Sequence, residues 1–156
     1  MSIRNVQPDD YMSIISVLNE WWGGRQMNDM LPKLFFIHFC ETSFIAEANG
    51  QATGFLIGFL SQTCTKKAYI HFAGVHPSYR KQGVGRALYD KFFETVKKLH
   101  RSKVRCVTSP INKQSIAYHL RMGFEAEPSD SKEDGVPYHR NYDGVGEHRV
   151  LLIKHL

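Results

Sequence analysis

The stretch Val75-His76-Pro77-Ser78-Tyr79-Arg80-Lys81-Gln82-Gly83-Val84-Gly85-Arg86-Ala87-Leu88 decides how this chain folds and what it can hold. Its first residue ends a predicted strand, Lys67–Val75, and a turn at Lys81–Gly85 opens an amphipathic helix that ends near His100. Glycines at such a junction let the backbone bend tightly and approach a ligand without a Cβ in the way. The free N–H groups of the first helical turn and the helix dipole both favour an anion. The residues therefore predict a phosphate or pyrophosphate site.

Positive charge gathers on the same part of the chain. The protein has a net charge of +5, but residues 80–105 carry nine basic residues against two acidic ones, and residues 1–65 carry three against six. An excess of this size attracts nucleic acid, a membrane surface or a phosphorylated small molecule, although a solvated helix face has the same composition.

Two common glycine-loop nucleotide sites do not fit the turn. A phosphate-binding loop of the GxxxxGK[ST] type needs a Lys-Ser or Lys-Thr pair after its glycines, and none follows here. A dinucleotide fingerprint needs glycine or alanine three residues after Gly85, where Leu88 stands. A plain structural turn remains the alternative at this point.

Hydrophobic periodicity predicts a single domain, residues 1–156, of mixed α/β class in the order βααβββαβαββ. Its other expected elements are a strand at Ile3–Val6, helices at Tyr11–Glu20 and Asn28–Cys40, a hairpin of Ser43–Ala48 and Thr53–Leu60, a strand at Val104–Thr108, a helix at Asn112–Met122, a strand around Phe124–Glu127, a loop at Glu127–Gly135 and a last strand at Arg149–Ile153.

Composition narrows the class of protein. With 42% hydrophobic and 22% charged residues, the chain has ordinary globular usage, which argues against disorder, collagen and coiled coil. No apolar run suits a membrane span, and the first residues lack the order of a secretion signal, so we expect a cytoplasmic protein without a membrane partner. The three cysteines, Cys40, Cys64 and Cys106, are widely spaced and predict neither a disulfide framework nor a metal site.

The stretch from Val75 to Leu88 resembles the acetyl-CoA-binding motif of the GCN5-related N-acetyltransferases (GNAT): a valine ending a strand, a proline two residues on, and Arg/Gln-x-x-Gly-x-Gly/Ala opening a helix. A second match, to an asparagine, a small-apolar helix and a Gly-Phe exit, lies at Asn112, Ser115, Ile116, Ala117, Gly123 and Phe124. The resemblance covers nearly the whole chain and implies a mixed, mostly antiparallel central sheet flanked by helices.

The resemblance also implies a set of acetyl-CoA-binding residues. Backbone groups of the strand end would pair with the pantetheine arm, amides of the turn would hold the pyrophosphate, and Asn112 would contact the pantetheine or adenosine side. The implied residues are Ala73, Gly74, Val75, Arg80, Lys81, Gln82, Gly83, Val84, Gly85, Arg86 and Asn112. Coenzyme A is a compact polyanion, so the basic stretch needs no nucleic acid to explain it.

The family's reaction is the direct attack of an amine on the thioester, which needs a neutral amine, an oxyanion donor and a proton for the thiol. Many relatives supply that proton from a tyrosine four residues before the glycine of Gly-Phe. His119 stands there in this chain, with Tyr118 beside it. His119 is either the acid or a cofactor or substrate contact, in which case solvent supplies the proton.

The base and the acceptor site are less determined. His71, on the strand before the motif, is a candidate base, and a half-buried histidine satisfied by a neighbour is the alternative; a water-mediated base, or none, is equally compatible. Trp22 and Arg25 are candidate substrate contacts, with core anchoring and plain surface exposure as their alternatives. Four carboxylates are further candidate bases: Glu41, Glu47, Asp143 and Glu147. Three phenylalanines, Phe35, Phe36 and Phe39, are expected as core or dimer contacts. Residues 138–144 either close over the acceptor or lie at a subunit interface.

We therefore expect an acetyl-CoA-dependent N-acetyltransferase that acts on a primary amine. A homodimer is a possible assembly of this protein. A small-molecule acceptor is expected over a protein tail because the chain shows no extra module for recognising one. A non-catalytic acyl-CoA sensor and a protein N-acetyltransferase are the alternatives. A nucleic-acid binder is disfavoured because aromatic residues do not interleave with the basic helix face.

Overall fold

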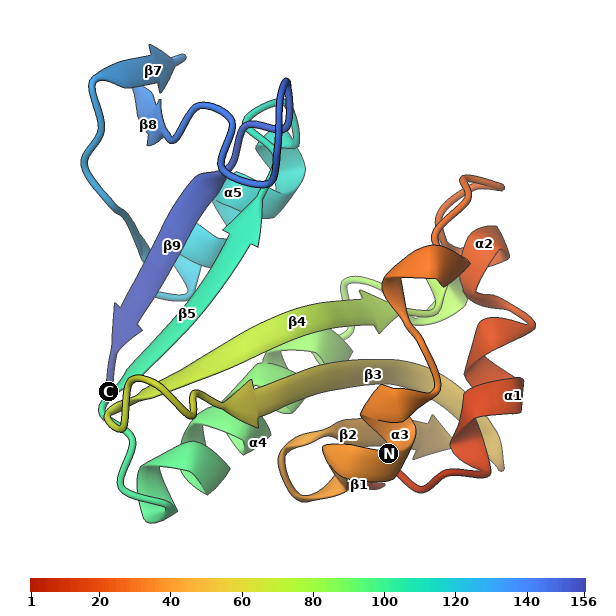
Figure 1. The fold of residues 1–156 in the computed structure, drawn as a ribbon. Helices are drawn as coiled ribbons and strands as arrows, with labels where there is room; N and C mark the ends of the chain where they lie inside the picture. The colour runs from red at the N-terminus through yellow and green to blue at the C-terminus, as the bar shows by residue number, and fades with distance from the viewer.

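The computed structural model describes all residues 1–156 as one seven-stranded sheet, a two-stranded hairpin and flanking helices (Figure 1). The sheet contains β1 (Ser2–Asn5), β2 (Phe44–Ala48), β3 (Gln51–Leu60), β4 (Lys67–Val75), β5 (Lys103–Thr108), β6 (Glu125–Ala126) and β9 (Val150–His155), and the hairpin contains β7 (Ser131–Glu133) and β8 (Val136–Tyr138). The helices are α1 (Asp10–Ile15), α2 (Leu18–Trp21), α3 (Leu34–His38), α4 (Val84–Lys98) and α5 (Lys113–Arg121), with 3₁₀ turns η1 (Asn28–Met30), η2 (Cys40–Thr42) and η3 (Pro77–Tyr79).

The sheet runs in the order β1-β2-β3-β4-β5-β9-β6, and every neighbouring pair is antiparallel except β4 and β5. Those two strands pair in parallel only where residues 67–69 face residues 103–105. Beyond that short ladder they diverge, and Figure 1 shows β4 and β5 opening into a V. The predicted mixed, mostly antiparallel sheet is confirmed, and the V leaves one edge of β4 without a partner strand.

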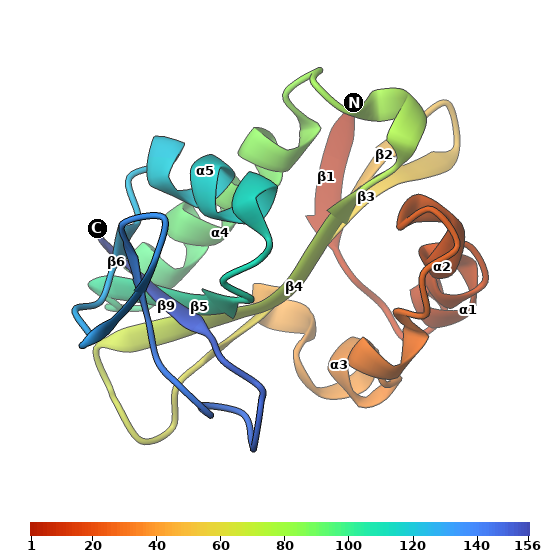
Figure 2. The same ribbon diagram turned by 90° about the horizontal axis from the view of Figure 1, so that it is seen from above.

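Helices cover the two faces of the sheet unequally. Figure 2 shows α4 and α5 on one face and α1, α2 and α3 on the other. Each face has its own core, since Leu56 packs toward α4 whereas its neighbours Phe55 and Ile57 pack toward α1–α3. This alternation is the period of two that a strand buried on both faces imposes. No helix reaches the length and apolar content required to cross a bilayer.

Two predicted helices are wrong as single elements. The helix expected at Tyr11–Glu20 is two short ones, α1 and α2: Ser16 is the C-cap of the first, and the β-branched Val17, at φ −116° and ψ −5°, is the N-cap of the second. The helix expected at Asn28–Cys40 contains only α3 and flanking 3₁₀ turns. Pro32 explains the break, because a residue before proline avoids helical angles, and Leu31 has φ −134° and ψ 65°.

The loop expected at Glu127–Gly135 is also incorrect in part, because β7 forms there and pairs with β8. The strand expected around Phe124–Glu127 exists as the two-residue β6, paired with β9. Both segments lie at the end of the sheet away from β1, so these differences leave the V between β4 and β5 unchanged.

Candidate functional site: the glycine turn and the open edge of β4

Helix α4 begins directly after Gly83, which has φ +84° and therefore occupies the left-handed region that glycine tolerates. The first hydrogen bond of the helix runs from the Ala87 N–H to the Gly83 carbonyl, 3.0 Å. The amides of Val84, Gly85 and Arg86 precede that bond, so they are available as donors. This is the arrangement that the sequence predicts for an anion site.

Gly85 fixes how close the turn lies to its neighbours. A Cβ at Gly85 would stand 2.7 Å from the Tyr118 hydroxyl oxygen and 3.5 Å from Val75 Cγ2. The turn is therefore held between the end of β4 and helix α5. The Tyr118 hydroxyl is buried and has no hydrogen-bond partner in the structure, which is an unusual state for a polar group.

The strand end Ala73–Val75 has one paired and one open edge. Toward β3 it is held in register, with Ala73 opposite Leu56, Gly74 opposite Phe55 and Val75 opposite Gly54. Toward β5 it lies past the last paired residue, Tyr69, and faces the V. Backbone groups on that edge can pair with an extended ligand as they would with another strand.

The basic side chains of the motif differ in whether they already have hydrogen-bond or ion-pair partners within the protein. Arg80 donates from Nε to the Val75 carbonyl, 3.2 Å, and from a guanidinium nitrogen to the Trp21 carbonyl, so it ties β4 to α2. Arg86 pairs with Asp90 on α4, 3.2 Å. Lys81 is exposed and makes no ion pair. The turn thus offers free backbone donors, one free lysine and two arginines with existing partners.

Gln82 and Asn112 each hold local structure. Gln82 Nε2 donates to the Ser78 carbonyl, 3.0 Å, which steadies the approach to the turn. Asn112 caps α5, since its Oδ1 accepts a hydrogen bond from the Ser115 N–H at 3.2 Å. Both residues are exposed, and Asn112 lies at the start of the helix that carries Tyr118.

His119 is buried, with 8% of its surface exposed, and both ring nitrogens are engaged. Nδ1 lies 2.7 Å from the Ser115 carbonyl and Nε2 lies 3.0 Å from the Tyr89 hydroxyl. A carbonyl only accepts, so Nδ1 carries the proton and Nε2 accepts from Tyr89 in the neutral ring. Burial lowers the pKa of His119, opposed in part by the bond to Ser115, so the neutral ring is favoured.

His71 is also engaged. Its Nε2 lies 2.6 Å from the Met30 carbonyl, and its ring stacks on Phe35 with centroids 4.3 Å apart. This is the geometry of a histidine satisfied by neighbours. The carboxylates proposed as other bases do not gather around it, because Glu47 pairs with Arg4, Asp143 and Glu147 pair with Arg149, and Glu41 lies in η2.

Trp22 lies against the predicted cofactor strand. A Cβ at Gly74 would stand 2.4 Å from Trp22 Cη2, and the indole also packs on Phe72 with centroids 4.9 Å apart. Arg25 follows α2 in an exposed loop, and its side chain makes no hydrogen bond or ion pair. Phe36 is fully buried in the core beneath α3, whereas Phe35 stacks on His71.

Two aromatic residues near the candidate site were not predicted from the sequence. Tyr89, on α4, is the partner of His119, and no local spacing links residues 30 positions apart. Tyr69 lies on the same face of β4 as His71, and it lines a small cavity of about 180 Å³ with Phe59 and Arg105. The alternation of β4 could have revealed Tyr69. Burial raises its pKa to about 12, so it remains protonated at neutral pH.

The sequence profile described as the Acetyltransferase (GNAT) family matches residues 9–124, which include β4, the glycine turn, α4 and the whole of α5 with its Gly-Phe exit. The chain belongs to this family. The resemblance predicted from the two motifs is thereby confirmed.

Curated GNAT relatives match about half of the chain. An uncharacterised N-acetyltransferase of Methanocaldococcus jannaschii is 35% identical over 86 residues, which cover 53% of this chain and 38% of that protein. The L-2,4-diaminobutyric acid acetyltransferase of Nocardia farcinica is 33% identical over 79 residues, which cover 51% and 41%. The chain thus spans less than half the length of either relative that it matches.

Solved structures share the GNAT fold over the whole chain. A putative GNAT acetyltransferase from Desulfovibrio desulfuricans superposes with a TM-score of 0.81 at 18% identity, covering 99% of this chain and 98% of that one. A putative acetyltransferase from Salmonella typhimurium, solved with its cofactor acetyl-CoA, superposes with a TM-score of 0.72 at 17% identity, covering 100% and 94%. At these identities the superpositions establish the fold.

Proposed function

We propose that this chain is an acetyl-CoA-dependent N-acetyltransferase that acts on a primary amine of a small molecule. One observation carries the proposal: the unpaired edge of β4 at Ala73–Val75 leads through η3 to a left-handed glycine turn with free helix amides. Family membership supports it, and so does the acetyl-CoA bound to a protein of the same fold.

The residues present fit coenzyme A. The edge of β4 offers backbone groups to the amide-rich pantetheine arm, and the amides of Val84, Gly85 and Arg86 suit a pyrophosphate. A side chain at Gly85 would collide with Tyr118, whose hydroxyl oxygen lies 2.7 Å from the added Cβ, and would disturb the turn that carries these amides. When bound, acetyl-CoA supplies an activated acetyl thioester. The chain's own part is to orient that thioester along β4, where a backbone N–H near Val75 can stabilise developing negative charge.

Helix α5 is the proposed source of the proton that the thiol product requires. The sequence places His119 at the usual position, but both of its nitrogens are engaged, whereas the adjacent Tyr118 hydroxyl is buried, unpartnered and directed at the turn. Burial raises the pKa of Tyr118, so its proton is present at neutral pH. We therefore expect Tyr118 to donate and His119 to position α5 through Tyr89.

Single variants separate these two roles. Tyr118→Phe should lower kcat by about 10- to 100-fold with little change in the Kd for acetyl-CoA, since general acid catalysis contributes roughly that much or more. His119→Gln keeps an acceptor for Tyr89 and should lower stability more than kcat. Loss of kcat in His119→Gln alone, at unchanged stability and Kd, would restore His119 as the donor.

The acceptor is proposed to be a small amine. The relative from Nocardia farcinica is named for an amino-acid acceptor, and the exposed guanidinium of Arg25 beside Trp22 suits a carboxylate on such a molecule. His71, covered by Phe35, is a proposed contact that a local movement must expose before it can act as a base. Without that movement, water removes the proton from the amine.

Turnover tests the proposed function. Thiol release from acetyl-CoA should rise above background with small amino acids and diamines, and not with peptides that present a free N-terminus. The Gly85→Glu variant should lose this activity, whereas Gln62→Glu, which adds the same charge in an exposed loop, should retain it. Tight binding of acetyl-CoA without turnover of any amine would favour the sensor, and turnover with peptides alone would favour a protein acetyltransferase.

A further inference from the structure

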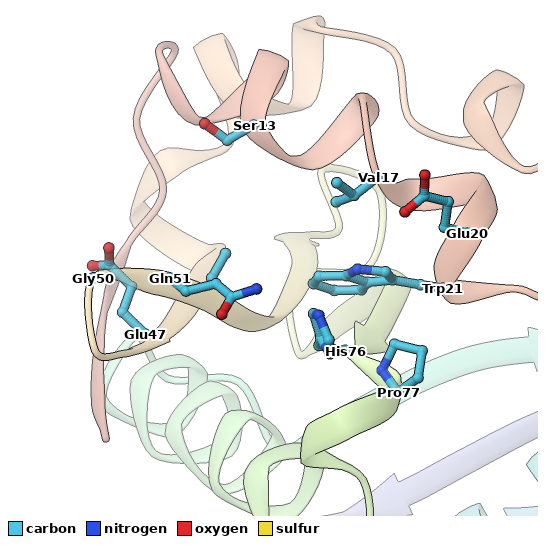
Figure 3. A pocket seen from close by; sticks show the side chains of 10 residues that line it. Ser13, Val17, Glu20, Trp21, Glu47, Gly50, Gln51, His76 and Pro77 are labelled. Carbon is cyan, nitrogen blue, oxygen red and sulfur yellow. The ribbon is translucent and has the colours of Figure 1, made fainter.

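A second cleft lies on the other side of β4 from the V. It has a volume of about 510 Å³ and is bounded by α1, α2, the β2–β3 hairpin and the turn after β4 (Figure 3). In the sheet β3 and β5 flank opposite edges of β4, and this cleft lies on the β3 side. The residues proposed to hold acetyl-CoA face β5, so the cleft does not belong to that site.

The lining of the cleft has one sign of charge. Two carboxylates, Glu20 and Glu47, stand on its walls, and neither lysine nor arginine lines it, although the protein as a whole is basic. Glu47 forms an ion pair with Arg4, whose Nε lies 2.7 Å from the Glu47 carboxylate, whereas the Glu20 side chain makes no ion pair or hydrogen bond. The Glu20 carboxylate therefore has no cationic partner within the protein.

Aromatic and polar groups complete the lining. Trp21 is 3% exposed and packs edge-on against His76, with ring centroids 5.4 Å apart. Figure 3 shows the Gln51 side chain extending from β3 toward these two rings. The Glu20 carboxylate and the Gln51 carbonyl oxygen offer a cation charge and hydrogen-bond acceptors, and the buried Trp21 forms part of the cleft wall.

We propose that this cleft binds a small organic cation with an ammonium or guanidinium head. The head pairs with the Glu20 carboxylate, Gln51 accepts a further hydrogen bond from it, and the edge of Trp21 lies in the same cleft wall. The cleft disfavours anions because two carboxylates and neither lysine nor arginine line it. This second site binds its ligand whether or not acetyl-CoA is present.

The chain supplies its own reporter for the experiment. It contains only two tryptophans, of which Trp21 lines the cleft and Trp22 covers Gly74 on β4. Their indole N–H resonances, assigned with Trp21→Phe and Trp22→Phe, can be followed as n-butylammonium or n-butylguanidinium is titrated into the full chain without acetyl-CoA. Either cation should shift the Trp21 resonance in a saturable way. Butyrate and n-butanol should not.

Charge variants sharpen the result. Glu20→Gln should weaken binding about tenfold, the loss expected for one charge-assisted hydrogen bond, and Glu125→Gln, an equal change on the distant β6, should not. The proposal is overturned by an unchanged affinity in Glu20→Gln, by an equal response to n-butanol, or by a shift of Trp22 alone, which would place the amine beside Gly74. The titration contains no acetyl-CoA, so none of these outcomes decides whether the chain is an acetyltransferase. The turnover assay tests that function separately.

Discussion

At the scale of single residues, Gly85 and Tyr118 form the contact on which the site depends. A Cβ at Gly85 would stand 2.7 Å from the Tyr118 hydroxyl oxygen. Gly85→Ala should therefore lower the free energy of unfolding by about 1–3 kcal/mol, as crowding in a packed region does. Tyr118→Phe should be nearly neutral, because its hydroxyl makes no hydrogen bond.

Combining the two substitutions tests the contact directly. The double variant should recover most of the stability lost in Gly85→Ala, since the atom that the new Cβ meets is gone. Denaturant unfolding of all four proteins provides the measurement. Losses that simply add would show that the strain at Gly85 lies elsewhere.

His119 predicts how stability depends on pH. Because its folded pKa lies below the usual 6.5, the unfolded chain takes up a proton first as the pH falls. The contribution of His119 is therefore complete above pH 6.5 and is lost progressively as the pH falls through the folded pKa. His119→Gln should flatten the fall in unfolding free energy just below pH 6.5, whereas His155→Gln, at an exposed position, should not. An unchanged slope in His119→Gln would contradict this assignment.

The sequence predicted some of these residues and not others, for physical reasons. Gly83 and Gly85 are recognisable from their spacing at a strand-to-helix turn. The structure shows that Gly83 uses the backbone freedom of glycine, at φ +84°, whereas Gly85 avoids a Cβ that would stand 2.7 Å from the Tyr118 hydroxyl oxygen. The states of His71 and His119 are not, because their partners Met30 and Tyr89 lie 41 and 30 positions away. Pattern indicates where a histidine lies along an element, but only the fold shows what its nitrogens bond.

At the scale of elements, β3 approaches α4 closely at Gly58, where the pairing with β4 is irregular. A Cβ there would stand 2.4 Å from Phe92 Cε2 and 2.9 Å from the Tyr69 carbonyl oxygen. Gly58→Ala should lower the free energy of unfolding by about 2 kcal/mol, measured by thermal or denaturant unfolding. Adding Phe92→Leu should restore only part of it, since the backbone oxygen remains. Full stability in Gly58→Ala would mean that the strands are farther apart.

Elements differ in how well their sequences reveal them. The long helix α4 and strands β3 to β5 were predicted because each buries a regular apolar face. The region of α1 to α3 was overestimated as helix, since its apolar spacing continues across the junction of α1 and α2 and across Pro32, where the helix is interrupted. The hairpin β7–β8 was missed because each strand has only three residues, β7 is polar and largely exposed, and β8 contains a proline.

At the scale of the whole molecule, the site exists only once distant segments assemble. The ladder between β4 and β5 is three residues long, and the divergence beyond it opens the edge of β4 next to α4 and α5. Charge counting overstated the free positive charge of this region. Arg101 donates to the carbonyls of Ser61, Cys64 and Lys67, and Arg105 pairs with Glu127. The proposed anion site therefore relies on backbone amides more than on the net charge of +7 between residues 80 and 105.

Calorimetric titration with acetyl-CoA tests the central claim most directly, with NAD and ATP as comparison ligands. The account predicts saturable binding of acetyl-CoA alone, its loss in Gly85→Glu, and its retention in Gln62→Glu. Thermal unfolding of the two variants shows that each remains folded. Two results would contradict the placement of the cofactor at the glycine turn. One is that the unaltered chain does not bind acetyl-CoA, and the other is that a folded Gly85→Glu variant binds it with unchanged affinity.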